Sequence, residues 1–171
     1  MNKLAMLIWL VLAGIARAQP QPEPTASLPD NIVLRLPVPG ACMSSPFGPR
    51  AAVGPHAALF HNGIDLPAAA GTWVGAAAAG RVAAVRHLGS SGLEVDIAHG
   101  QPGHGFITRY AHLGSVAPAI AVGGSQIAAG GRIGRIGRSG VTTGTHLHFE
   151  LRIDGKPVDP APFLHTNSCG L

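Results

Sequence analysis

The stretch Gly144-Thr145-His146-Leu147-His148-Phe149-Glu150-Leu151 alternates strictly between polar and apolar side chains from its first histidine onward. Successive side chains of a β-strand point to opposite faces, so the pattern predicts a half-buried strand. Both histidines and the glutamate lie on one face, and the two leucines and the phenylalanine face the core. Paired imidazoles on one strand face favour metal binding over a plain solvent-exposed face, which would more often carry Thr, Lys or Glu.

The rest of the chain also favours strands. Among its 171 residues are 24 glycines and 15 prolines, and in a helix interior each Gly costs about 1 kcal/mol and each Pro about 3 relative to Ala. Short apolar runs are instead separated by Gly-rich segments, at Trp73-Val74, 81–85, 93–98, 106–110, 132–136 and 146–153. We therefore expect an all-β, antiparallel sandwich or barrel-like fold with few or no helices.

A second group of polar residues lies in Phe60-His61-Asn62-Gly63-Ile64-Asp65-Leu66. Gly63, Ile64 and the following Pro67 favour an extended chain, in which His61 and Asp65 share a face because their separation is even. The intervening Ile64 and Leu66 would then face the core. Taken alone, the stretch favours a surface histidine and a turn aspartate over a functional site.

The third group is Thr108-Arg109-Tyr110-Ala111-His112-Leu113, where period-two alternation places Tyr110 and His112 on one face. A lone histidine after a strand is usually structural. Combined with the other two groups, however, it gives several imidazoles and a carboxylate, which suit a catalytic zinc site with an open position for water.

Residues 1–18 have the layout of a secretory signal peptide. Lys3 precedes an uncharged run from residue 4 to residue 16, and Ala16-Arg17-Ala18 predicts cleavage before Gln19. The uncharged run is short compared with the roughly 20 residues that span a bilayer, so it favours export over a stable membrane anchor. We therefore expect an exported protein, periplasmic or extracellular and associated with the cell wall.

The remaining chain is predicted to comprise a Pro-rich, extended and mostly unpacked leader (19–43), a folded domain (44–166) and a short tail (167–171). Cys42 and Cys169 lie near opposite ends, which in an oxidising compartment favours a disulfide over two separate buried thiols or a two-cysteine zinc site. The formal net charge of +4 and the 5% aromatic content do not suggest nucleic-acid binding. We expect a monomer.

Taken together, these motifs resemble the LytM/lysostaphin-type (M23) zinc metallopeptidases, which cut peptidoglycan peptides. The resemblance runs from Ser44-Ser45-Pro46-Phe47-Gly48-Pro49-Arg50, through the three groups above, to Pro157-Val158-Asp159-Pro160. It covers nearly the whole expected domain, and several motifs in the correct order are highly specific. Thr145 stands where the family often has Pro, and 51–59 and 101–105 look like loop variations. These departures bear on the shape of the groove rather than on metal binding.

The resemblance implies a Zn²⁺ cofactor with His61, Asp65 and His148 as its ligands. His112 and His146 match the two histidines beside the metal that act on the water and on the reacting carbonyl. Spacing alone does not decide which of His146 and His148 binds the metal, so that assignment comes from the resemblance. No His-Glu-x-x-His motif is present, so a helix-borne glutamate base is not expected.

Other residues are given lesser roles. The resemblance implies a groove that holds the zinc site, and Tyr110 is expected to position substrate there or to stabilise developing charge. The Gly-rich run 131–140 is predicted to form a strand and turn at the groove edge, with its arginines alternating between faces. The remaining histidines are interpreted as loop or surface residues: His56, His87, His99, His104 and His165.

The function expected from these observations is hydrolysis of peptide cross-links or bridges in peptidoglycan. The alternative is a non-catalytic cell-wall-binding module or an activator of other wall hydrolases. Such relatives typically lack metal ligands, whereas all five expected site positions are filled here. The scissile bond, a glycine bridge or a D-alanyl cross-link, stays open, with the export signal and terminal cysteines favouring a periplasmic cross-link endopeptidase.

Overall fold

The computed structural model describes residues 34–51, 59–101 and 105–170. Its elements are β1 (Gly48–Pro49), β2 (Phe60–His61), β3 (Ile64–Pro67), β4 (Trp73–Gly75), β5 (Gly80–Leu88), β6 (Gly92–His99), β7 (Phe106–Val116), the 3₁₀ helix η1 (Pro118–Ile120), β8 (Gln126–Ile127), β9 (Arg132–Ile136), β10 (His146–Ile153), β11 (Lys156–Val158) and α1 (Ala161–Leu164). The predicted signal peptide and most of the predicted leader lie outside the described residues. Within the described ranges, no helix is long and apolar enough to cross a membrane.

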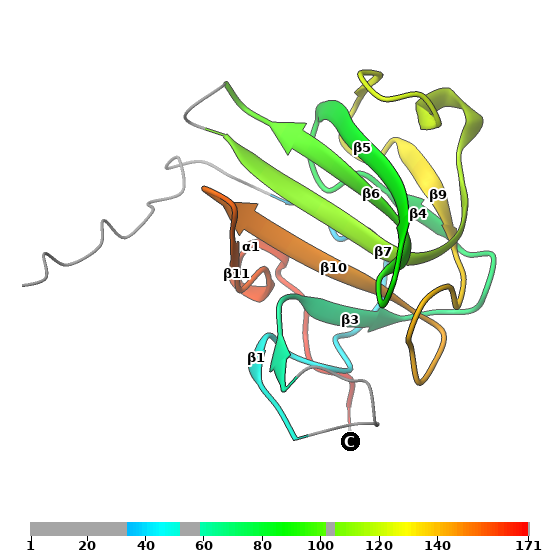
Figure 1. Cartoon of the computed structure of the whole chain (residues 1–171). Coiled ribbons are helices and arrows are strands. Elements are labelled where there is room, and N and C mark those ends of the chain that lie inside the picture. The colour runs from blue at the N-terminus through cyan, green and yellow to red at the C-terminus, as the bar shows by residue number, and fades with distance from the viewer. Residues whose placement is uncertain (1–33, 52–58, 102–104, 171) are drawn as a thin grey trace, which may run out of the picture.

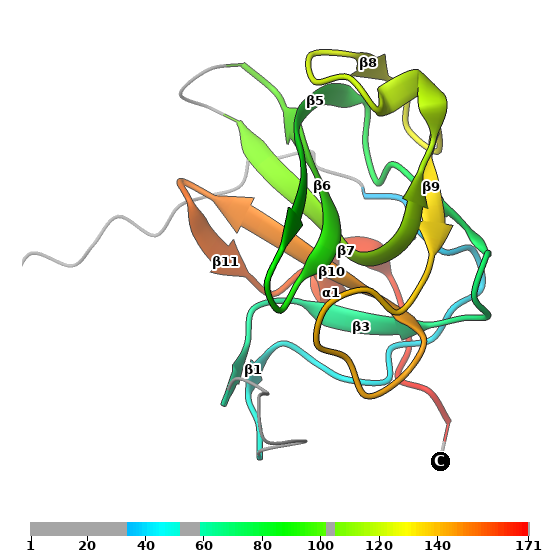
Figure 2. The same ribbon diagram turned by 45° about the vertical axis from the view of Figure 1, so that its right-hand side comes forward.

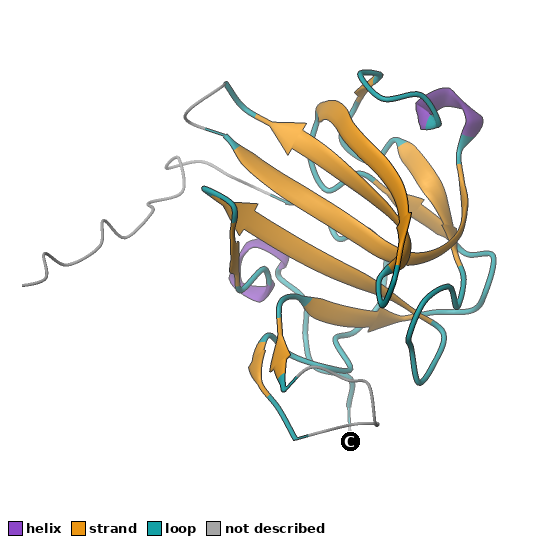
Figure 3. Cartoon of the chain, viewed as in Figure 1, coloured by secondary structure: helices purple, strands orange, loops and turns teal. Residues whose placement is uncertain are grey.

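Most strands belong to one antiparallel sheet with the central order β11-β10-β7-β6-β5-β8 (Figure 1). β3 pairs with β10, β9 pairs with β7, and β4 pairs with β9, while β1 and β2 form a separate two-stranded ribbon. In the described part of the chain the only helical elements are η1 and the single turn α1 (Figure 3). The predicted all-β antiparallel fold with few helices is confirmed.

β7 is long enough for two strands to share one of its edges. Residues 106–111 of β7 pair with β10, and residues 113–116 pair with β9. The backbone of His112, at the junction, has a φ of 60°, and the pairing of β7 with β9 shifts register just after it. Figure 2 shows β9 continuing along the far half of β7, beyond the end of β10. The sheet therefore changes direction at His112.

The core is built from the apolar faces of these strands. Leu147, Phe149 and Leu151 of β10 are fully buried, which confirms the alternation predicted from the sequence. Ile64 and Leu66 of β3 are fully buried as well, also as expected. Because every second side chain of β3 and β10 is fixed in the core, the residues between them are held on the opposite face.

Residues 34–43 are packed against the domain, so the predicted leader boundary at residue 43 is wrong. Leu34 and Val38 are each 3% exposed and belong to the core. The backbone N–H of Leu34 donates to the carbonyl of Phe163, and the N–H of Arg35 donates to that of Ala77. Proline content predicted an unpacked chain, but the apolar residues between the prolines alternate and fill a core site. The folded unit therefore begins no later than residue 34.

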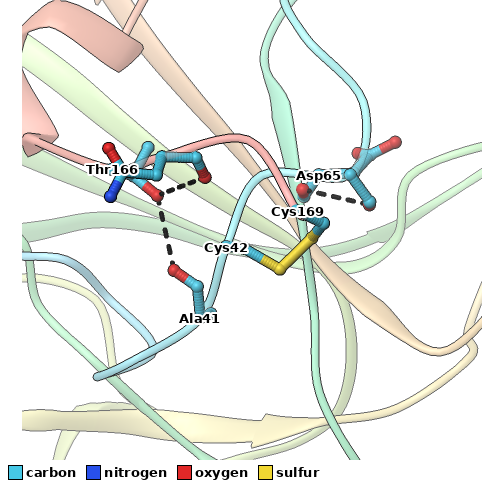
Figure 4. Close-up of a disulfide and its surroundings, with 7 residues drawn as sticks. Ala41, Cys42, Asp65, Thr166 and Cys169 are labelled. Atoms are coloured by element: carbon cyan, nitrogen blue, oxygen red, sulfur yellow. Dashed lines mark hydrogen bonds between the residues drawn. A yellow bond between two sulfur atoms is a disulfide. The ribbon is translucent and has the colours of Figure 1, made fainter. Parts of the chain in front are cut away.

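Cys42 and Cys169 form a disulfide, as predicted from the sequence (Figure 4). The neighbouring backbones are also paired, because the N–H of Met43 donates to Asn167 and the N–H of Cys169 donates back to Met43. The hydroxyl of Thr166 adds a hydrogen bond to the carbonyl of Ala41. The described part of the predicted C-terminal tail is thus joined to the N-terminal segment of the domain.

The arginines of β9 do not alternate between faces as predicted. The guanidinium carbons of Arg132 and Arg135 lie 4.5 and 3.7 Å from the ring centroid of Trp73. The pairing of β4 with β9 shifts register between Val74 and Gly75, so Arg132 lies opposite Gly75 and Arg135 opposite Trp73. This irregularity places two residues of odd separation on the same face, which period-two reasoning cannot anticipate.

We predict that Gly63→Ala destabilises the fold. A Cβ at this position would lie 2.2 Å from the carbonyl oxygen of Phe149, and this backbone cannot move away without disturbing β10. The expected loss in the free energy of unfolding is about 1 to 3 kcal/mol, measured by urea denaturation. The matched control is Gly123→Ala, where a Cβ has no neighbour within 4 Å. Equal stability of the two variants would contradict the prediction.

Candidate metal centre

Strand pairing brings Asp65 and His148 together. β3 runs antiparallel to β10 in a register that places Asp65 directly opposite His148. Directly opposite residues project to the same face of a sheet, with Cβ atoms about 5 Å apart. The register is fixed by the apolar residues on either side, since a slip by one position would expose them to water.

A bend places His61 beside this pair. β2 ends at His61, and the chain bends at Asn62 and Gly63 before β3 begins. The expectation of one continuous extended strand is therefore wrong here, although the expected convergence of His61 with Asp65 occurs. Nε2 of His61 lies 3.1 Å from Oδ1 of Asp65 and 3.0 Å from Nδ1 of His148. Nδ1 of His148 lies 3.0 Å from the same carboxylate oxygen.

The other nitrogen of each of these two imidazoles is occupied by a hydrogen-bond acceptor. Nδ1 of His61 is 2.7 Å from the carbonyl oxygen of Pro46 and donates to it. Nε2 of His148 is 3.2 Å from Oε1 of Glu150. With the outer nitrogens protonated in this way, Nε2 of His61 and Nδ1 of His148 both point to the centre. When a metal replaces the proton that lies between these groups, both nitrogens can offer it a lone pair.

The pKa values of Asp65 and His148 are shifted in opposite directions. Burial raises the pKa of Asp65, but hydrogen bonds from His148 and His61 outweigh it and hold the pKa well below its usual range. Burial lowers the pKa of His148, but the carboxylates of Asp65 and Glu150 raise it to about 9. In the metal-free chain at pH 7, Asp65 is therefore ionised and His148 is protonated. A cation at the centre would take the place of that proton.

His112 reaches the same centre from β7. In a regular strand His112 would follow Tyr110 into the core, but its left-handed backbone breaks the alternation. Its Nδ1 donates to the carbonyl of Ser139 at 2.9 Å, which leaves Nε2 with the lone pair. Burial lowers the pKa of His112 to about 4, so the imidazole is neutral at pH 7.

His146 completes the group from the start of β10. Its ring packs against the ring of His112 with centroids 5.0 Å apart and an interplanar angle of 81°. Nε2 of His146 lies 3.4 Å from Oδ1 of Asp65, and Nδ1 lies 3.4 Å from the hydroxyl of Thr142. Burial lowers its pKa, which favours the neutral ring. The site thus combines three clustered donor atoms with two further imidazoles beside them.

The sequence also matches the model of a known protein family. The family model described as peptidase family M23 matches residues 59–160 of this chain. The chain belongs to peptidase family M23. The matched range contains every site residue named so far except Pro46, whose carbonyl oxygen accepts from His61. The resemblance stated from the sequence motifs is confirmed.

Curated relatives and a solved structure extend the comparison. The M23 chain is 40% identical to the DD-carboxypeptidase/endopeptidase Mpg of Neisseria meningitidis over 118 residues, which are 69% of this chain and 26% of that protein. It is 37% identical to the peptidoglycan DD-endopeptidase ShyA of Vibrio cholerae over 99 residues, which are 58% of this chain and 22% of that protein. A zinc-containing peptidase from Vibrio cholerae superposes with a TM-score of 0.66 at 30% identity, covering 75% of this chain and 39% of that one. The chain thus spans about a quarter of the length of these two curated relatives.

The M23 site gathers five of the six residues expected from the sequence, and Tyr110 is the exception. Its side chain is fully buried and packs against Phe149 in the core. The hydroxyl accepts a hydrogen bond from the N–H of Ala77 at 2.8 Å and a second one from the hydroxyl of Thr108 at 2.9 Å. The role expected for Tyr110 in contacting substrate does not fit this position. The error came from assuming that regular alternation continues through His112.

We predict that Tyr110→Phe costs stability and leaves the chemistry of the site unchanged. Removing the hydroxyl leaves the buried N–H of Ala77 without its partner, at a cost of about 1 to 3 kcal/mol. Urea denaturation measures the loss, and the rate of peptidoglycan digestion per folded molecule should equal that of the unchanged chain. A large fall in this rate with unaltered stability would show instead that the hydroxyl acts in the site.

Of the histidines interpreted as loop or surface residues, His99 is buried, so that interpretation is wrong for it. It stacks on Phe106 with ring centroids 4.6 Å apart, and Nδ1 donates to the carbonyl of Ala79. His87 and His165 are exposed, as expected, and His56 and His104 lie outside the described residues.

Sequence reasoning missed Ser139, which fixes the position of His112. The Ser139 hydroxyl accepts from the N–H of Leu93 and donates to the carbonyl of Leu113, while its own carbonyl accepts from His112. The loop from residue 137 to residue 145 is also hydrogen-bonded to the turn between β5 and β6, because the N–H of Val141 donates to the carbonyl of Ser90. Figure 2 shows this loop beside that turn. A serine in a Gly-rich run carries no sequence signal for such a role.

Proposed function

We propose that this chain is an exported zinc metalloendopeptidase that hydrolyses peptide cross-links of peptidoglycan. The observation that carries the proposal is the cluster of His61, Asp65 and His148, whose donor atoms all lie within 4.8 Å of one another. It lies in a chain of family M23, with two further imidazoles beside it. We propose His61, Asp65 and His148 as the metal ligands and His112 and His146 as the catalytic residues.

The donor set fits a zinc ion. Two imidazole nitrogens and one carboxylate oxygen are ligands that zinc prefers, and catalytic zinc sites keep three protein ligands and one open position. Ligand atoms of a tetrahedral zinc lie about 3.3 Å apart, close to the 3.0 to 3.1 Å between the donors here. A bound zinc ion supplies Lewis-acid polarisation of a carbonyl and lowers the pKa of a bound water to about 7.

His112 is suited to move the proton. It is neutral at pH 7, and because Nδ1 donates to Ser139, its Nε2 is the atom that can accept a proton from the attacking water. The same nitrogen can afterwards return that proton to the leaving amine. The hydrogen bond to Ser139 favours this tautomer, and the ring lies beside those of His146 and His148, with centroids 5.0 and 5.9 Å away.

His146 is suited to stabilise charge. Its Nε2 faces the centre, 3.4 Å from Oδ1 of Asp65, where a ring N–H can donate to negative charge developing on the substrate carbonyl oxygen. In that tautomer Nδ1 carries no proton and is an acceptor, and the hydroxyl of Thr142 lies 3.4 Å from it. This arrangement gives His112 and His146 complementary roles.

The names of the relatives support the substrate class. Mpg is named a DD-carboxypeptidase/endopeptidase and ShyA a peptidoglycan DD-endopeptidase. We propose the D-alanyl cross-link as the scissile bond for this chain, in the periplasm, with the protein acting as a monomer. The predicted signal peptide and the disulfide are consistent with an oxidising compartment.

The alternative is a wall-binding or activating protein without catalysis. It would have no need for His112 and His146 beside the ligands, nor for the left-handed backbone that brings His112 there. Both proposals predict contact with peptidoglycan, so binding alone does not separate them.

Digestion of purified peptidoglycan separates the two functions. The protein is incubated with cross-linked sacculi, with and without a chelator, and the soluble muropeptides are identified by mass spectrometry. We expect cross-linked dimers to be converted to monomers, with the conversion lost on chelation and restored by zinc. Binding to sacculi with no change in the muropeptides would contradict the proposal and favour the alternative.

A further inference from the structure

Glu150 is the acceptor that fixes the orientation of His148. It lies two residues further along β10, on the same face of the strand, and Oε1 is 3.2 Å from Nε2 of His148. The residue is only 6% exposed, so water does not compete freely for the same imidazole nitrogen. This hydrogen bond favours the tautomer in which Nδ1 of His148 carries the lone pair that faces the metal centre.

Glu150 is itself held by two arginines on the same face. Its Oε2 accepts a hydrogen bond from the guanidinium of Arg152 at 2.7 Å and lies 3.9 Å from that of Arg109. Each carboxylate oxygen therefore has its own partner, Oε1 towards His148 and Oε2 towards the arginines. A buried carboxylate paired in this way has a fixed position and charge.

The pairing continues across the sheet. Arg109 of β7 makes two hydrogen bonds, 2.8 and 3.0 Å long, to Asp96 of β6. Arg86 of β5 then contacts both Asp96 and Glu94 of β6. We call this row of alternating charges the charge ladder, and its residues are Arg152, Glu150, Arg109, Asp96, Arg86 and Glu94. It crosses the neighbouring strands β10, β7, β6 and β5. On β10, its member Glu150 contacts His148 of the candidate metal centre.

We propose that Glu150 is a positioning residue for the metal ligand His148, anchored by its hydrogen bond from Arg152. The proposal rests on the proposed function, because it assumes that His148 binds zinc through Nδ1. Acceptors on the outer nitrogen of a ligating histidine fix its tautomer and raise its basicity, and their loss typically weakens metal affinity 10- to 100-fold.

The test compares two variants of the whole protein. Glu150→Met removes the acceptor while keeping a side chain of similar length, and Glu94→Met is the matched control. Glu94 is as buried, at 2% exposed, and belongs to the same ladder, but it forms ion pairs with Arg86 and Arg109 rather than contacting a site histidine. Zinc affinity is measured by competition with a chromophoric chelator. We expect about 10- to 100-fold weaker binding for Glu150→Met and unchanged affinity for Glu94→Met.

A rescue variant separates positioning from structural damage. Glu150→Gln keeps an oxygen acceptor in place. Its zinc affinity should lie within about threefold of that of the unchanged protein, a much smaller loss than the 10- to 100-fold expected when the acceptor is removed. Wild-type affinity in Glu150→Met, or an equal loss in Glu94→Met, would overturn the proposal.

A measurement on the unchanged protein covers the case in which Glu150→Met does not fold. Nitrogen-15 NMR of the zinc-loaded chain should show His148 protonated at Nε2, with a slowly exchanging N–H proton. A proton at Nδ1, or rapid exchange at Nε2, would overturn the proposal. If the unchanged protein binds no stoichiometric zinc, the proposed function fails as well, so the two failures are distinguishable.

Discussion

His148→Ala is expected to bind no stoichiometric zinc and to leave peptidoglycan cross-links uncut. The substitution removes one of three donor atoms, leaving His61 and Asp65 as an incomplete ligand set. Metal polarisation is worth several kcal/mol of transition-state stabilisation, and each 1.4 kcal/mol is tenfold in rate, so activity should fall by at least about 10³-fold. Zinc content is measured by elemental analysis, and activity by the release of monomeric muropeptides.

The control for this variant is His87→Ala. His87 is an exposed histidine of β5, outside the candidate site, so its removal should leave zinc content and activity unchanged. Circular dichroism of both variants tests whether the sheet is intact. Full activity in His148→Ala would refute its assignment as a ligand.

Removal of the disulfide is expected to have the largest effect on stability. Cys42 and Cys169 are 127 residues apart, and the loop-entropy model assigns about 4 to 5 kcal/mol to a closed loop of this size. The double variant Cys42→Ser/Cys169→Ser should therefore unfold at a much lower urea concentration. The change in the free energy of unfolding comes from the midpoint and slope of the denaturation curve.

Reduction of the unchanged protein provides the matching control. A thiol reductant should shift the midpoint of the unchanged protein to that of the double variant and leave the double variant unaffected. The backbone hydrogen bonds between Met43 and residues 167–169 remain possible in both cases, so the comparison isolates the covalent link. A double variant within about 1 kcal/mol of the oxidised protein would contradict the loop-entropy argument.

The parts of the fold that depend on regular alternation could be predicted from the sequence. β10 has period-two apolar residues throughout, and its core face is as expected. Features that depend on irregular backbone could not. Tyr110 was placed on the wrong side because the left-handed conformation of His112 breaks the period, and the arginines of β9 were misplaced by a register shift opposite β4.

The candidate site also has parts that the sequence predicts and parts that it does not. The five clustered side chains were identified through family resemblance, since the spacing of His61, Asp65, His112, His146 and His148 does not by itself show that they meet. Groups that hold these side chains are less visible in the sequence. The carbonyl oxygens that fix His61 and His112 belong to Pro46 and Ser139, and any residue type can supply a carbonyl.

The most direct test of the account is a crystal structure of the zinc-loaded protein with anomalous data collected on both sides of the zinc absorption edge. We predict one strong zinc peak, about 2.0 to 2.2 Å from Nε2 of His61, a carboxylate oxygen of Asp65 and Nδ1 of His148. Density for zinc elsewhere, with these three donor atoms unliganded, would contradict the central claim that they form the catalytic metal centre.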